Sequence, residues 1–348
     1  MPRLSDCLGS PECVEGAFRE LRSEGVSEAR PRLLGQGLVW NDREERQKGE
    51  LMPEKVLLAT DSSKDAILAA RAAVDVCEGT GAKLHVVHVW HSVPTARLRA
   101  FMRAELKKRG NELLEEAVKG VEDSGGLVTG AHLVEGRAAD EILDLAEQIG
   151  AGLILIGSRG LGPVGRIALG SVSEAVIHHS RCPVLVLRGG EDAWPPERVI
   201  FGDDGSEAAR AAGDLGASLC GHHGARAQVL RAYPELPEVD AEGRGLDPRI
   251  VDDELRRAEK ALLERSRELE SRLGSRPKSR PKVRLVVGDA ASCLLEAAEE
   301  DAPARTLLVV GNRGLGAIGR MRLGSVSTKV VHAAKGPVLV HPPLQGET

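Results

Sequence analysis

Two copies of one glycine-rich pattern carry the residues of this sequence that could do chemistry. The pattern is G-x2-G-x9-G-S, and its fixed positions are Gly157, Gly160, Gly170 and Ser171, then Gly311, Gly314, Gly324 and Ser325. Glycine permits a positive φ angle and lets backbone N–H groups approach an anion closely. The closing Gly-Ser precedes a predicted helix, whose first amides and positive dipole end attract negative charge. The pattern therefore predicts two sites for an oligophosphate.

The residues around each glycine pattern support this interpretation. Each pattern starts where a predicted strand ends, which is where open α/β sheets bind their ligands. Ser171 and Glu174 form an S-x-x-E capping box, which predicts a helix start at the serine. Arginines recur in both loops, and we expect them to contact phosphate oxygens: Arg159, Arg166, Arg313 and Arg320.

Two other phosphate motifs are weaker explanations. Gly160-x-Gly162-x-x-Gly165 spells the dinucleotide fingerprint, but it follows the fourth predicted strand, and the residue 20 positions after Gly165 is Leu185 instead of an acid. A Walker loop needs G-K-[ST], which the sequence lacks. Glycines that serve tight turns alone remain an alternative.

Strands and helices alternate around the first pattern. Short apolar runs predict strands at 56–59, 84–89, 127–134, 153–156 and 183–187. Helical periodicity falls between them, at 64–77, 95–121, 139–149 and 172–179. This alternation predicts a doubly wound, mostly parallel open sheet.

The same order then repeats, so the chain holds two tandem α/β units. Residues 157–187 and 311–341 align without a gap, and 18 of 31 positions are identical. We expect strands at 199–201 and 227–233 and a long amphipathic helix at 251–273. The closing strands 183–187 and 337–340 begin with proline, as edge strands often do, and we expect them to pair as an internal pseudo-dimer.

Composition excludes several classes of protein. The 348 residues carry a net charge of −5, which argues against a nucleic-acid partner held by a general positive field. No apolar run reaches the length of a membrane helix, and the first residues lack the apolar core of a signal peptide. The six cysteines form no C-x-x-C pair and suit a reducing compartment. We expect a soluble, cytoplasmic protein.

The expected domains are a flexible extension at 1–51, a first α/β domain at 52–188, a linker at 189–198 and a second domain at 199–342. The extension is charged and contains no strand that its pattern predicts. Met52 precedes the first strand closely, so either the extension is a tail or translation begins at Met52.

This constellation resembles the nucleotide-binding branch of the universal stress protein family in tandem form, over about 53–342. The resemblance implies a Rossmann-like fold of the adenine nucleotide α-hydrolase type, with ATP, alone or with Mg²⁺, bound at the strand ends. It implies that Asp61 and Asp204 contact the adenine–ribose end and that Val89 and Ala232 offer backbone groups to the base. It implies that ribose and phosphates contact the loop residues Gly157, Gly160, Gly170, Ser171, Val172 and Ser173, and Gly311, Gly314, Gly324, Ser325, Val326 and Ser327.

Several alternatives stay open at this stage. Asp61 and Asp204 could be simple turn or cap residues. The first half has Asp61-Ser62-Ser63 where the common pattern is D-G-S, and we expect little effect because serine is small. No catalytic or metal-binding residues are predicted, so the leading function is regulatory nucleotide binding, and a slow ATPase or adenylyl-transferring enzyme is the alternative. The physiological nucleotide, the inducing stress and a further homodimer are left open.

Overall fold

The computed structural model describes residues 32–34, 37–39, 52–91, 99–160, 169–221, 223–234, 248–273, 280–312 and 324–343. Its contacts divide the chain into two units, Met1–Glu50 and Leu51–Thr348. The first unit contains an antiparallel hairpin of β1 (Arg32–Leu34) and β2 (Gly37–Val39). The expectation of no strand there is therefore wrong. Apolar residues on both sides of a two-residue connection favour such a hairpin.

The second unit is built on one ten-stranded sheet. Its strands are β3 (Lys55–Ala59), β4 (Lys83–Trp90), β5 (Val128–Glu135), β6 (Leu153–Gly157), β7 (Val184–Leu187), β8 (Arg198–Gly202), β9 (Arg226–Tyr233), β10 (Lys282–Val287), β11 (Thr306–Gly311) and β12 (Val338–His341). The order is β10-β9-β8-β11-β12-β7-β6-β3-β4-β5. Each half contributes five parallel strands, which confirms the predicted doubly wound arrangement.

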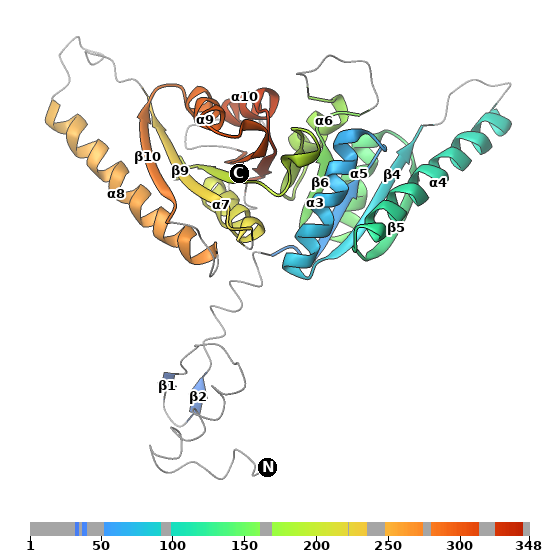
Figure 1. Ribbon diagram of the computed structural model, residues 1–348, viewed down its shortest axis with the longest axis horizontal. Coiled ribbons are helices and arrows are strands. Elements are labelled where there is room, and N and C mark those ends of the chain that lie inside the picture. Colours follow the sequence, from blue (N-terminus) through green and yellow to red (C-terminus); the bar gives the residue numbers. More distant parts are fainter. Residues whose placement is uncertain are drawn as a thin grey trace. The chain divides into compact units, whose positions relative to one another are not determined.

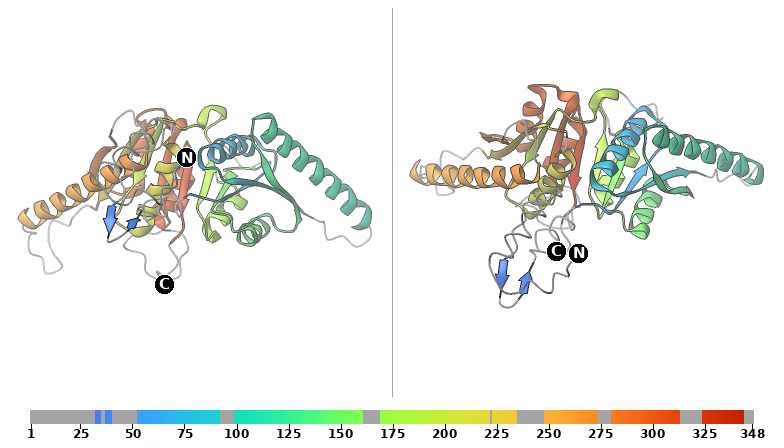
Figure 2. Two further views of the ribbon diagram at one scale, coloured as in Figure 1. Left: turned by 90° about the horizontal axis from the view of Figure 1, so that it is seen from below. Right: turned by 60° about the horizontal axis from the view of Figure 1, so that its bottom comes forward.

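The two halves meet where β7 and β12 pair antiparallel, at the centre of the sheet (Figure 2). Val184 lies opposite Val340, and Val186 lies opposite Val338. This pairing satisfies the backbone groups of two strands that would otherwise be exposed edges. The prediction that the closing strands of the two halves pair with each other is confirmed.

Helices cover both faces of the sheet (Figure 1). One face packs against α3 (Lys64–Thr80), α4 (Arg99–Asp123), α7 (Glu207–Cys220) and α8 (Pro248–Arg272). The other face packs against α5 (Ala138–Ile149), α6 (Ser171–His179), α9 (Ala290–Glu299) and α10 (Ser325–Ala333). Short 3₁₀ turns at Glu191–Ala193 and Pro303–Arg305 complete the described elements.

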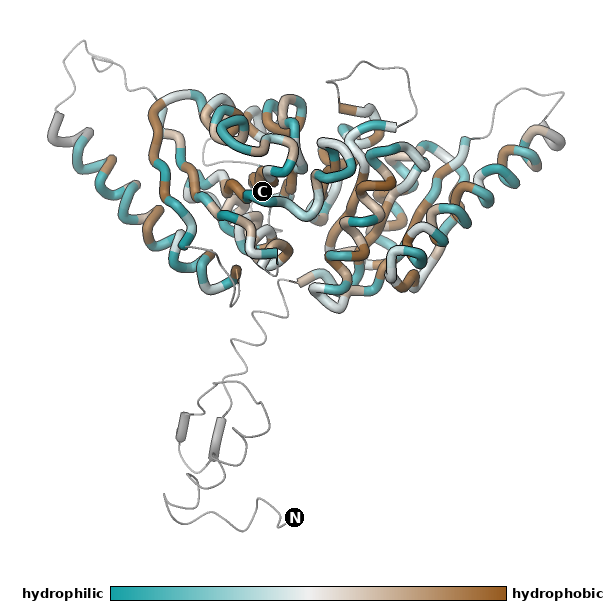
Figure 3. Tube along the Cα trace, in the orientation of Figure 1, coloured by the Kyte–Doolittle hydropathy of each residue, from teal (hydrophilic) through white to brown (hydrophobic). Residues whose placement is uncertain are grey.

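The cores are aliphatic, as the scarcity of aromatic residues requires. Strand side chains such as Leu57, Leu155 and Ile200 are fully buried. The long helices α4 and α8 are mostly hydrophilic along their length (Figure 3). On α8, Leu262 and Leu269 are fully buried, so this helix is amphipathic and covers the sheet as expected.

Local signals fix the start of the helix that follows the first strand in each half. Ser63 is the N-cap of α3, and its side chain accepts a hydrogen bond from Ala66 N at 3.3 Å. Ser206 does the same for α7, from Ala209 N at 3.1 Å. Both helices therefore begin immediately after a strand, at the edge of the sheet where the glycine loops lie. In the described part of the chain, no helix is both long and apolar enough to cross a membrane.

Candidate functional site

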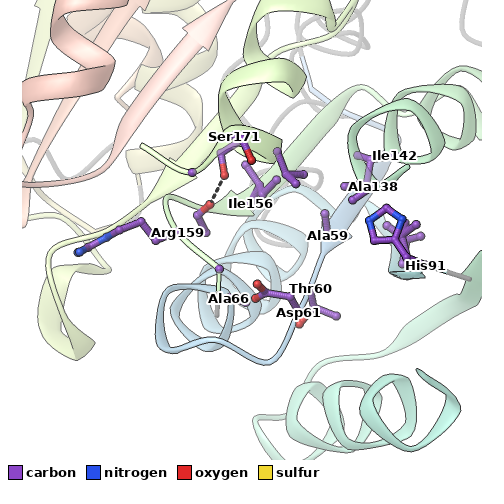
Figure 4. A pocket seen from close by; sticks show the side chains of 17 residues that line it. Ala59, Thr60, Asp61, Ala66, His91, Ala138, Ile142, Ile156, Arg159 and Ser171 are labelled. Carbon is purple, nitrogen blue, oxygen red and sulfur yellow. Dashed lines mark hydrogen bonds between the residues drawn. The ribbon is translucent and has the colours of Figure 1, made fainter. Parts of the chain in front are cut away.

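A cavity of about 560 Å³ opens at the carboxyl ends of the strands in the first half (Figure 4). Its lining residues come from β3, β4 and β6, from α3, α5 and α6, and from the chain next to them: Ala59, Thr60, Asp61, Ala66, Val87, Val89, His91, Ala138, Ile142, Ile156, Gly157, Arg159, Gly160, Gly170, Ser171, Val172 and Ser173. The volume is in the range of small-molecule sites. All the described loop residues expected to bind nucleotide in this half line it, together with Asp61 and Val89.

The cavity has two chemically different ends. Its apolar wall contains Val87, Val89, Ile142 and Ile156, which suits a flat organic ring. At the other end α6 begins, with Gly170 as a cap residue that has no side chain. The first helical hydrogen bond runs from Glu174 N to Gly170 O at 2.9 Å. The amides of the three preceding helix residues have no acceptor within the helix, so they can bind an anion.

Close packing, more than backbone conformation, explains the glycines of the loop. A Cβ on Gly157 would lie 2.8 Å from Ala66 N, at the first turn of α3. A Cβ on Gly160 would lie 2.3 Å from Asp61 Oδ2. Gly170 has φ −69°, and Gly324 has φ −72° in the second half. These two glycines therefore do not use the positive φ that glycine permits, because both lie in the extended region that any residue adopts.

The predicted capping box at Ser171 does not form. Gly170 is the N-cap and Ser171 is the first helical residue, so the serine is one position too late to cap the helix. The Glu174 carboxylate instead lies 3.4 Å from Nε2 of His332 on α10. A contact from the other half of the chain therefore replaces the local hydrogen bond that the pattern predicted. A hydrogen bond from Ser173 Oγ to Gly157 O, at 2.8 Å, joins the start of α6 to the end of β6 and so fixes the two ends of the loop.

Asp61 is a turn residue that also lines the cavity, and its contact with a nucleotide stays a prediction. Its Oδ1 accepts a hydrogen bond from Ser63 N at 3.0 Å, which forms the turn between β3 and α3. It also lines the cavity, with Oδ2 beside Gly160. Ser62, between these residues, has φ 62°, whereas the equivalent Gly205 has φ 82°. Serine in place of glycine is therefore not neutral for the backbone, because an L-residue is strained in this region.

Of the four arginines expected to contact phosphate, Arg159 is the one within the described residues. Arg159 lines the cavity in part, but its guanidinium extends away from the labelled residues at the centre of Figure 4. Its Nε lies 3.9 Å from Asp65 Oδ2. Three further expected contacts, Arg166, Arg313 and Arg320, lie outside the described residues, as does Gly314.

The second half repeats the described part of this geometry. Asp204 Oδ1 accepts from Ser206 N at 3.0 Å, as Asp61 does from Ser63. Ser327 Oγ donates to Gly311 O at 2.6 Å, as Ser173 does to Gly157. The other expected residues occupy the equivalent places on β9 and at the start of α10: Ala232, Gly324, Ser325 and Val326.

Sequence reasoning missed part of the lining. His91 directly follows β4 and could have been found from that position, because it stands at the same sheet edge as Asp61. Ala138 and Ile142 belong to the start of α5, and apolar periodicity marks them only as helix residues that face a core. Their place in the cavity wall follows from tertiary packing, which the sequence does not display.

The family now follows from comparison with known proteins. The profile of the "Universal stress protein family" matches residues 52–188 and 196–342. The chain belongs to the universal stress protein family. A universal stress protein from Mycolicibacterium smegmatis is 28% identical over 295 residues, covering 82% of this chain and 96% of the relative. A crystal structure of a universal stress protein from Archaeoglobus fulgidus covers 83% of this chain and 98% of its own, with TM-score 0.59 and 22% identity.

A further solved universal stress protein is a complex with cAMP. It covers 39% of this chain and 98% of its own, with 26% identity and TM-score 0.33. The first two relatives match both halves in order, and the third has the size of one half.

Proposed function

We propose that this universal stress protein binds an adenine nucleotide in each half and acts as a regulatory protein whose conformation or partners depend on occupancy. One observation carries the proposal. A single cavity joins an apolar wall to three helix amides that lack an acceptor in the helix. A nucleotide has the complementary chemistry, with a flat base at one end and an anion at the other.

The first site would hold an adenine nucleotide as follows. The base would lie against the wall that contains Val89 and Ile142, and Asp61 would accept hydrogen bonds from ribose hydroxyls. Phosphates would bind the amides of Ser171, Val172 and Ser173. Among the described residues that line the cavity, Asp61 is the one carboxylate, so a Mg²⁺ ion would be held mostly by the phosphates themselves.

We propose no catalytic turnover of enzymatic rate. Asp61 Oδ1 accepts the Ser63 amide, and in the proposed pose its other oxygen accepts ribose hydroxyls, so this carboxylate is not available to activate water. His91 contributes an imidazole to the described lining of the cavity, and it is the side chain to test as a base. Phosphate release should stay well below about 1 s⁻¹, the lower end of typical enzyme rates. Faster release that is lost in His91→Ala would favour the alternative, an ATPase or adenylyl-transferring enzyme.

The decisive experiment has two parts. The first identifies any nucleotide bound to the purified protein, and the second introduces a negative charge at each helix start to abolish nucleotide binding. Purified protein is denatured and any released nucleotide is identified by mass spectrometry. Titration calorimetry with ATP is then run on the double variant Ser171→Glu, Ser325→Glu. Both serines are exposed first residues of their helices. Glutamate is favoured at that position, so the fold should hold while its carboxylate repels phosphate.

The matched control is the double variant Ser171→Ala, Ser325→Ala, which leaves the amides free and should still bind ATP. Unchanged ATP affinity in the glutamate variant would show that the phosphates do not bind at these helix starts. The expected cytoplasmic location is a separate prediction, which fractionation of cells would check.

A further inference from the structure

The base of the first glycine loop holds a carboxylate that the second half lacks. Asp65 is the second residue of α3, and its side chain is 13% exposed. Its Oδ2 accepts a hydrogen bond from Ser158 Oγ at 2.6 Å. The equivalent residues of the second half are Ala208 and Asn312, and both are buried. The halves thus differ in their shielded charges, because the first has Asp65 and Arg188 where the second has Ala208 and Pro342. The second half has its own shielded carboxylate, Asp203, in the place of Thr60, and that carboxylate is paired with Arg231.

The Asp65 carboxylate restrains the arginine of the loop. Arg159 Nε lies 3.9 Å from Asp65 Oδ2, and its guanidinium extends away from the cavity in Figure 4. The Arg159 main chain is held as well, because Ser63 Oγ donates to its carbonyl oxygen at 2.9 Å. A phosphate that arrives at the start of α6 therefore meets an arginine whose charge is already partly neutralised.

A second cation, Arg188, lies near Asp65, but it does not supply a positive charge to the cavity in place of Arg159. Arg188 is 6% exposed and donates from Nη1 to Ala334 O, at the carbonyl end of α10, at 2.9 Å. Burial lowers its pKa to about 10, and the Asp65 carboxylate opposes that shift. Arg188 does not belong to the cavity lining. Asp65 could therefore have a purely structural role as a counter-charge to Arg188, and an experiment must separate this role from an effect on ligand choice.

We infer that Asp65 sets the phosphate charge that the first site accepts. The first site favours an adenine nucleotide with one phosphate, and the second site, with alanine in that place, favours the more highly charged ATP. Repulsion between the carboxylate and the ligand grows with each phosphate, and the low dielectric of a shielded site strengthens it. This inference rests on the proposed nucleotide-binding function and assigns a different ligand class to each half.

The test measures AMP and ATP affinities at one site at a time. In a Ser325→Glu background the first site is the one measured, and AMP should bind at least as tightly as ATP. Adding Asp65→Asn keeps an acceptor for Ser158 Oγ but removes the charge. The ATP-to-AMP affinity ratio should then rise on the order of ten-fold. Asp144→Asn is the control, because it removes an exposed carboxylate of α5 that does not line the cavity.

The reverse exchange provides a second, independent measurement. In a Ser171→Glu background the second site should bind ATP more tightly than AMP. Ala208→Asp with Asn312→Ser rebuilds the serine–carboxylate pair there and should lower the ATP-to-AMP ratio by a similar factor. If Asp65→Asn is poorly folded, this exchange decides the question, and an unchanged ratio in it overturns the inference.

Three results contradict the inference in distinguishable ways. An unchanged ratio in Asp65→Asn shows that its charge does not act on the phosphates. An equal loss of AMP and ATP affinity shows a structural role beside Arg188, since such a role lowers both together. In either of these two cases the unmodified chain still binds AMP and ATP, so the proposed nucleotide-binding function stands. Absence of binding by either nucleotide to the unmodified chain overturns the proposed function, and this inference with it.

Discussion

Replacing Gly157 with alanine tests whether close packing at the cavity floor explains that glycine. The new Cβ would lie 2.8 Å from both Ala66 N and Asp65 C, and 3.0 Å from Asp65 Cβ. Ordinary contact begins at 3.4 Å, so the first turn of α3 must retreat by roughly 0.6 Å. Overpacking of this kind costs about 1–3 kcal/mol of unfolding free energy. Nucleotide affinity should fall as well, because Ala66 and Gly157 both line the cavity.

Urea unfolding followed by circular dichroism measures the cost, and calorimetry measures the affinity. Gly120→Ala is the matched control, because Gly120 lies within α4 and its Cβ would meet nothing within 4 Å. Alanine there should stabilise the protein by about 0.5–1 kcal/mol, since glycine weakens a helix interior. The same substitution should thus have opposite signs at the two positions. A stabilised Gly157→Ala, or two variants of equal stability, would refute the packing argument.

Three further predictions follow from single features. Ser62→Gly should raise the unfolding free energy by up to about 1 kcal/mol in urea unfolding, because it relieves a positive φ, and Gly205→Ala should lower it by a similar amount. His85 and His132 share a hydrogen bond of 3.1 Å, and burial lowers the pKa of both, with mutual charge repulsion adding to the shift of His85. Below pH 6.5 the unfolded chain then binds more protons than the folded one, so the free energy of unfolding should fall on acidification below that pH. Denaturation curves at several pH values measure this, and His85→Gln should make the free energy of unfolding depend less on pH. The fragment Met52–Thr348 should keep its nucleotide affinity and its stability within about 0.5 kcal/mol, and a loss above about 2 kcal/mol would contradict this.

Local sequence patterns were enough to predict most of the second unit. The fully buried strand β6 is a continuous apolar run, and its neighbouring helices have clear apolar periodicity. The repeat itself predicted where the halves join, because two short closing strands without a partner need each other's backbone groups. The hairpin at β1 and β2 was missed, since two three-residue strands carry too few residues to show a period.

Contacts distant in sequence could not be predicted. Glu174 looked like part of a capping box because its spacing from Ser171 fits one, yet it contacts His332 of the other half. The alternative partner lies more than 150 residues away, and no local pattern reveals it. Likewise, the cavity wall at Ile142 forms only because α5 packs over β3 and β4.

The repeat also shows why matching motifs do not establish matching sites. The two glycine loops share two arginines and all five of their glycines, so sequence reasoning assigned the same ligand to both. One residue that distinguishes their surroundings is Asp65 against Ala208, which lies over 90 residues before its loop and outside the motif. Helix α3 delivers that carboxylate because it starts next to Gly157. If the proposed function holds, a shared loop would provide the anion-binding amides in each half, and the helix that begins beside it would provide the charge that adjusts which anion those amides accept.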